Sequence, residues 1–243
     1  MTWEELQISA LQKIFEIESN MLIVDDSTAP YIAAMPGAAN EAMLLLCTDA
    51  RYFKKTGEII QKQPEEQPEA PEEPEDTEQT KAKKEEIPEE TPEEGGATPP
   101  TFAAGKYNAY DLRQVFPDFY TLYDGYIMYT DSVVYERAEY ETEGDSILLL
   151  PADKMGTWRV TYCAYPERIT KETTKDTELT LAPEAASMVA LYIAGQIYKE
   201  DDISLAQTYM NEFLEWLNRL KENAKKADSM GKNTKWKSRT GWW

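Results

Sequence analysis

The chain has 243 residues, 42% of them hydrophobic, so it can form one or two domains with a substantial core. It contains no histidine, which excludes a histidine-based catalytic triad and a histidine-ligated metal site. Its formal net charge of −20 argues against binding to nucleic acid, because an acidic surface repels the phosphates and gains nothing from counterion release.

The N-terminal residues predict a helix over about 3–17. Thr2 and Glu5 have the spacing of a capping box, and apolar residues follow at helical intervals. The chain lacks the basic and apolar regions of a signal peptide here, and no apolar run reaches the ~18–20 residues of a membrane span. We therefore expect a soluble chain that is not secreted through a classical signal and that has no membrane partner.

Two more helices are expected in the N-terminal helical part, which we place at residues 1–61. Thr28 and Pro30 predict a short helix that ends near Pro36, where proline and glycine follow each other. A third helix is predicted over about 38–52, and residues 58–61 have the composition of a short extended piece.

Residues 62–100 differ sharply in composition from the rest of the chain. The stretch 64–100 holds eight of the fourteen prolines, 14 acidic and 3 basic residues, and no aromatic residue. Such a composition cannot bury a core and predicts a long, disordered, acidic Pro/Glu linker. A sharper alternative is an acidic decoy that keeps other chains or DNA away.

Residues 101–175 predict a small β-module. A short helix that starts at Asn108 or Asp111 and ends at Val115 comes first, and four β-rich runs with turn residues between them follow. In the last run, alternate residues from Trp158 onward predict an inward face. We expect an antiparallel sandwich or barrel. The four runs are 123–129, 132–140, 146–150 and 157–165.

Residues 176–224 predict a pair of helices, over about 183–198 and 204–220. The first is almost free of charge, which favours a central, covered position. The second carries an apolar stripe that includes Phe213 and Trp216, so both are predicted to lie in the core. The fold class is therefore α+β: one helical domain built from the N- and C-terminal helices, with the β-module inserted.

No motif supports catalysis, and we expect no catalytic, cofactor-binding or metal-binding residue. The carboxylate pairs Glu136/Glu139 and Asp201/Asp202 are interpreted as solvated surface, since 45 acidic residues produce such pairs by chance. Cys47 and Cys163 fit no metal spacing and are expected to be small buried apolar residues. Ten of fifteen tyrosines lie between 107 and 165, which leaves a carbohydrate-binding or surface-binding β-module as an alternative.

Residues Leu179–Glu184 form a Leu-x-Leu-x-Pro-Glu segment that enters the apolar helix. This segment is the strongest of several that, in their order along the chain, resemble the head-to-tail connector, or adaptor, proteins of tailed bacteriophages. The resemblance covers roughly 1–60 and 105–222, and leaves the linker and the tail without a carried-over role. The other segments are 2–17, 31–40 (YIAAMPGAAN), 110–120 (YDLRQVFPDFY), 156–169 (GTWRVTYCAYPERI) and the continuation of the helix pair to 217.

The resemblance implies a structural virion protein at the portal–tail junction, made in the host cytoplasm. It implies a ring of identical subunits, such as a dodecamer, that contacts the portal protein and a tail or second neck-ring protein. DNA would pass through this ring without specific binding, which agrees with the acidic composition.

The tail, 225–243, holds six basic residues and one acidic residue and is not expected to form a helix, because it lacks an apolar period. We expect it to become ordered on the portal or a neighbouring subunit, with tryptophans as buried anchors. A frayed, solubilising terminus is the alternative. The predicted docking residues are Lys232, Lys235, Trp236, Lys237, Arg239, Trp242 and Trp243.

Overall fold

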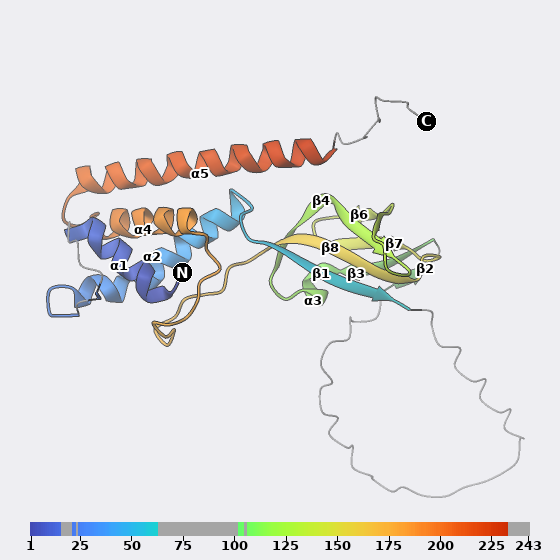
Figure 1. Ribbon diagram of the computed structural model, residues 1–243, viewed down its shortest axis with the longest axis horizontal. Coiled ribbons are helices and arrows are strands. Elements are labelled where there is room, and N and C mark those ends of the chain that lie inside the picture. Colours follow the sequence, from blue (N-terminus) through green and yellow to red (C-terminus); the bar gives the residue numbers. More distant parts are fainter. Residues whose placement is uncertain (16–20, 23, 63–101, 105, 233–243) are drawn as a thin grey trace, which may run out of the picture. The chain divides into compact units, whose positions relative to one another are not determined.

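The protein is a mixed α+β structure of helices and antiparallel strands (Figure 1). The computed structural model describes residues 1–15, 21–22, 24–62, 102–104 and 106–232. The predicted linker therefore lies outside the described residues, apart from Lys62. The chain divides into two compact units: a helical unit of residues 1–57, 116–126 and 160–243, and a strand unit of residues 58–115 and 127–159.

Helix α1 (Trp3–Phe15) begins with the capping box that its sequence predicts. The Thr2 amide donates to Glu5 Oε2 at 2.8 Å, and the Glu5 amide donates to Thr2 Oγ1 at 3.2 Å. These reciprocal bonds satisfy two N–H groups that would otherwise lack partners at a helix start. The predicted helix is thus confirmed over Trp3–Phe15, and its predicted last residues, 16–17, lie outside the described residues.

Helix α2 (Ala29–Thr48) is one continuous helix, so the predicted break at Pro36 is wrong. A proline inside a helix removes one hydrogen bond and costs about 3 kcal/mol. Met35 and Ala39 on either side of it are fully buried, and the same face continues through Ala42 and Leu46. Packing of this face against the core outweighs the local cost of the proline.

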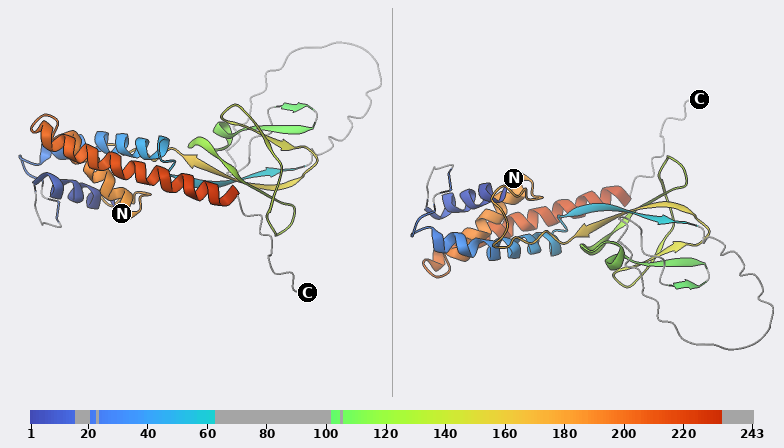
Figure 2. Two further views of the ribbon diagram at one scale, coloured as in Figure 1. Left: turned by 90° about the horizontal axis from the view of Figure 1, so that it is seen from above. Right: turned by 90° about the horizontal axis from the view of Figure 1, so that it is seen from below.

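Helices α4 (Pro183–Ile197) and α5 (Ile203–Lys232) form the predicted pair. Ten of the fifteen residues of α4 are buried, which confirms its covered position. Figure 2 shows α5 packed along α4 and then running on well past it. The predicted end near Leu220 is wrong, and so is the expectation that the tail forms no helix, as far as residues 225–232 are concerned. The Lys-, Glu- and Ala-rich stretch to Lys232 continues α5 without an apolar period.

The strands form two four-stranded sheets, in the orders β1-β8-β4-β5 and β2-β3-β7-β6. The recorded pairs within them are antiparallel, for example Tyr107 opposite Pro151. Closure into a sandwich or barrel stays a prediction. The strands are β1 (Lys54–Gln61), β2 (Phe102–Ala104), β3 (Tyr107–Asp111), β4 (Phe119–Thr130), β5 (Glu136–Arg137), β6 (Glu141–Glu143), β7 (Ile147–Pro151) and β8 (Gly156–Ala164).

Of the two predicted starts of the short helix, Asp111 is confirmed and Asn108 is not. Residues 107–111 form β3, and α3 (Leu112–Val115) starts after Asp111, whose Oδ1 accepts the Arg113 amide at 3.0 Å. The predicted strand over 132–140 shrinks to the two residues of β5. In β8 the predicted alternation is confirmed from Trp158 to Ala164, with Cys163 buried as well.

Candidate interaction surfaces

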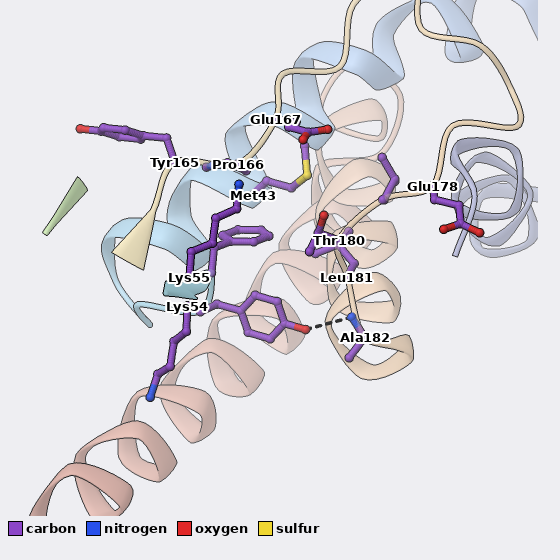
Figure 3. A pocket seen from close by; sticks show the side chains of 13 residues that line it. Met43, Lys54, Lys55, Tyr165, Pro166, Glu167, Glu178, Thr180, Leu181 and Ala182 are labelled. Carbon is purple, nitrogen blue, oxygen red and sulfur yellow. Dashed lines mark hydrogen bonds between the residues drawn. The ribbon is translucent and has the colours of Figure 1, made fainter. Parts of the chain in front are cut away.

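One pocket lies in the helical unit, and we call it the Leu181 pocket (Figure 3). It measures about 590 Å³, which is within the range of ligand pockets. One wall is the segment that leads into α4, and another is the start of β1. It is lined by Met43, Tyr52–Lys55, Tyr165–Glu167 and Glu178–Ala182.

Hydrogen bonds from backbone amides hold the segment that lines the pocket and leads into α4. The amide of Ala182 donates to the Tyr52 hydroxyl at 2.9 Å, the dashed bond in Figure 3. The Leu179 amide donates to the carbonyl of Met1 at 2.8 Å. The segment Leu179–Glu184, which carries the strongest resemblance, thus runs from one side of this pocket into the first turn of α4.

The charges of the Leu181 pocket have partners or balance one another. Lys54 Nζ lies 4.1 Å from the centre of the Tyr123 ring, and Lys55 Nζ lies 2.7 Å from Asp118 Oδ2. Glu167 and Glu178 supply the opposite charge on the other segments. With no nucleophile placed beside a base, this geometry suits an apolar side chain of a binding partner better than a reaction.

Asp118 is the charged centre of a small hydrogen-bond cluster. Burial would raise its carboxyl pKa, but the ammonium of Lys55 and the hydroxyl of Tyr162, which donates at 2.9 Å, together hold that pKa below its usual value. Burial, and then the bond to Asp118, raises the pKa of the Tyr162 hydroxyl. Both groups keep their ordinary charge at neutral pH, so the cluster ties β1, β4 and β8 together rather than moving protons.

A second, smaller pocket of about 330 Å³ lies beside the turn between α4 and α5, and we call it the Tyr31 pocket. Its lining combines apolar side chains with two carboxylates, Glu200 and Asp201. It is lined by Ser27, Pro30, Tyr31, Ala34, Ala38, Gln196, Ile197, Glu200 and Asp201.

Helix α5 leaves large apolar side chains in solvent, which corrects the prediction for Trp216. Phe213 is fully buried as predicted, but Trp216 is 41% exposed and Leu214 is 47% exposed. Trp216 has Arg219 at 5.0 Å from its ring, and Arg219 in turn pairs with Glu215 at 2.6 Å. The apolar arc of the helix is therefore wider than the face that its own unit covers.

The strand unit presents a second exposed apolar site in the turn after β4. Val133 is 86% exposed and Val134 is 78% exposed. The next residue is fixed: the Tyr135 hydroxyl donates to Glu58 Oε1 at 3.0 Å, and the Arg159 guanidinium stacks 3.9 Å from its ring centre. The two exposed valines therefore form a small apolar site on a turn that Tyr135 holds in place.

The two cysteines are buried, as predicted. Their sulfurs lie 4.0 Å apart, and both side chains are fully covered. The hydrogen bond with Cys163, together with burial, raises the pKa of the Cys47 thiol, so it stays protonated and unreactive. Within the described residues no group of three or more potential metal ligands comes together.

Most of the predicted docking residues cannot be placed. Lys232 is the last residue of α5, and the other six lie outside the described residues: Lys235, Trp236, Lys237, Arg239, Trp242 and Trp243. Neither pocket was predicted, and neither were the exposed valines, because pockets are assembled from segments that lie far apart in the sequence. The acidic turn between α4 and α5 was the one sequence signal, and it points to the Tyr31 pocket.

The carboxylate pairs lie on the surface, as interpreted. Glu136 and Glu139 are exposed, as are Asp201 and Asp202. The Asp202 carboxylate accepts the amides of Ser204 and Leu205 at 2.9 and 3.0 Å, which is the role of an N-cap at the start of α5. Neither pair has the setting of a general acid and base.

The chain matches no protein-family model, and no curated protein matches it. None of the described helices is long and apolar enough to cross a membrane.

Proposed function

We propose that this chain is a structural virion protein that forms a ring in the neck of a tailed phage. The ring joins the portal to the tail and lets DNA pass, and the protein has no catalytic role. The proposal comes from the resemblance of residues 1–60 and 105–222 to head-to-tail connector proteins. The acidic composition supports it, since a negatively charged channel does not retain a duplex.

The observation that carries the proposal is the uncovered flank of α5. Leu214 and Trp216 lie on opposite edges of the buried stripe around Phe213, and both remain about half exposed. A monomer gains nothing from apolar side chains in water, whereas a ring buries such edges against neighbouring subunits. Aromatic residues are also enriched in the centres of protein interfaces.

Light scattering after size-exclusion chromatography tests this function directly. The wild-type chain is expected to elute as a closed oligomer, or to form one when portal-bearing heads are added, visible as a ring by cryo-electron microscopy. A strictly monomeric protein that does not join such heads would contradict the proposal. Leu214→Ser/Trp216→Ser is expected to shift the oligomer toward monomers, while the exposed pair Glu212→Ser/Asn211→Ser on the same helix leaves it unchanged.

No observation favours the carbohydrate-binding alternative. Among the described tyrosines between 107 and 165, the one exposed ring is Tyr165. Tyr110, Tyr123, Tyr129 and Tyr162 are buried in the two units. Rings that stack on sugars must face solvent, so these side chains fit the half-buried strands that tyrosine favours.

A further inference from the structure

The lining of the Tyr31 pocket combines apolar side chains with two carboxylates. Pro30, Tyr31 and Ala34 of α2 and Ile197 at the end of α4 form the apolar part. At about 330 Å³ it is near the lower end of the ~300–1,000 Å³ typical of ligand pockets. A cavity of this size suits one large side chain rather than an extended peptide.

The two carboxylates that line the pocket are free to bind a cation. Neither Glu200 nor Asp201 has an ion-pair partner within the described residues. The nearby cation, Lys199, donates to Gln196 Oε1 at 2.6 Å, and Asp202 is used by the first turn of α5. The lining therefore favours a group that carries positive charge beside an apolar anchor.

The C-terminal part of this sequence has that chemistry. Trp236 is flanked directly by Lys235 and Lys237, and no acidic residue occurs from Lys232 to Trp243. We propose that the Tyr31 pocket of one chain receives Trp236 of a second copy, with Lys235 and Lys237 beside Glu200 and Asp201. The Leu181 pocket is a poorer match, because its two lysines offset its two glutamates.

Because α5 is long, the Trp236 that enters the Tyr31 pocket must come from a second copy of the chain. The pocket includes Asp201, just before the helix begins, whereas Trp236 follows its far end at Lys232. Thirty helical residues span ~45 Å, and the four residues from Lys232 to Trp236 reach back at most ~14 Å when fully extended. A chain's own Trp236 cannot enter its own Tyr31 pocket.

Such a contact joins different surfaces of two identical chains. Heterologous contacts of this kind generate rings when the rotation closes. The inference deepens the proposed function, on which it rests, by naming a contact that links neighbouring subunits. It also assigns the basic tail an acceptor on this chain; binding of the tail to another virion protein is the competing outcome.

Charge reversal in the full-length chain tests the contact. Glu200→Lys/Asp201→Lys and Lys235→Glu/Lys237→Glu are each expected to weaken self-association by about tenfold or more, measured by sedimentation velocity. Combining all four substitutions restores the opposite charges and is expected to recover most of the association. Trp236→Ala is expected to weaken it without rescue. Glu143→Lys/Asp145→Lys, a matched charge change on exposed residues of the strand unit, is the control and leaves association unchanged.

Each other result overturns the inference. If the Glu200→Lys/Asp201→Lys variant associates as strongly as the wild type, the inference is overturned. The proposed function stands in that case if the protein still forms a ring. If each reversal weakens association but their combination does not recover it, the tail binds elsewhere, and the pocket is not its acceptor. A wild-type chain that is monomeric in solution and does not join portal-bearing heads contradicts the proposed function as well.

Discussion

Helices α4 and α5 follow each other in the chain but use their apolar residues differently. Ten of the fifteen residues of α4 are buried. In α5, up to Lys225, the buried residues are Ala206, Phe213 and Leu217, while Leu214 and Trp216 stay about half exposed. The apolar side chains of α4 are buried within the folded chain, whereas some apolar side chains of α5 remain exposed and can contact a partner.

The difference arises from how the two helices are placed in the helical unit. Helix α4 packs against α1, α2 and α5, so it is covered from several sides. Helix α5 has twice as many residues as α4 and extends beyond it, as Figures 1 and 2 show. We expect substitutions at the α4–α5 contact to change stability, and substitutions on the outer flanks of α5 to change assembly.

Phe213→Ala tests the buried contact and should have the largest effect. The ring is fully buried and meets the Tyr192 ring edge-to-face, with centroids 4.9 Å apart. Its removal leaves a cavity and is expected to lower the free energy of unfolding by ~3–5 kcal/mol, as measured by urea denaturation. A loss below 1 kcal/mol would mean that α5 is not held through this residue.

Ala190→Leu tests whether α4 is fully covered. Ala190 is completely buried, so a larger side chain must displace its neighbours. Overpacking is expected to cost ~1–3 kcal/mol of unfolding free energy. Ala224→Leu, the same change at a half-exposed position of α5, is the control and should stay within ~0.5 kcal/mol. Equal effects at both positions would remove the distinction between the two helices.

Trp216→Ala separates stability from assembly. The substitution removes a half-exposed ring and its contact with Arg219, so the expected loss of unfolding free energy is only about 1 kcal/mol. Its effect on the oligomer, read by light scattering, should exceed that of Arg219→Ala. A loss of unfolding free energy close to that of Phe213→Ala would mean that Trp216 belongs to the core.

The apolar stripe of α5 was predictable, but not how much of it is covered. Spacing correctly placed Phe213 inside and wrongly placed Trp216 there, because periodicity marks the centre of an apolar arc and not the width of the surface that packs on it. The extension to Lys232 was missed for a related reason: its helix-forming residues carry no apolar period.

Local signals elsewhere had mixed success. The Thr2–Glu5 capping box was predictable because both partners lie within one turn. The helix end predicted at Pro36 was wrong because α2 is kept continuous by burial against core residues that are distant in the sequence. The Tyr31 pocket needs α2 beside the α4–α5 turn, an arrangement that no sequence period encodes.

Lys221→Ala should have the smallest effect and sharpens the view of the second half of α5. Lys221 Nζ lies 2.6 Å from Asp49 Oδ2, just after the end of α2, with both side chains more than one third exposed. Such pairs contribute ~0–1 kcal/mol and weaken as salt screens them. The expected loss of unfolding free energy is in this range and disappears at high salt.

Hydrogen exchange shows whether this ion pair holds the end of α5 in place. In the wild type, the amides of residues 222–225 are expected to exchange faster than those of α4, since the side chains of these residues are exposed or half-buried. Lys221→Ala should increase the exchange of those amides further. Arg219→Ala, which breaks a pair with Glu215 inside α5, should not. Protection after Lys221 equal to that of α4 would show that the whole of α5 is anchored in the monomer, and the contrast between the two helices would then fail.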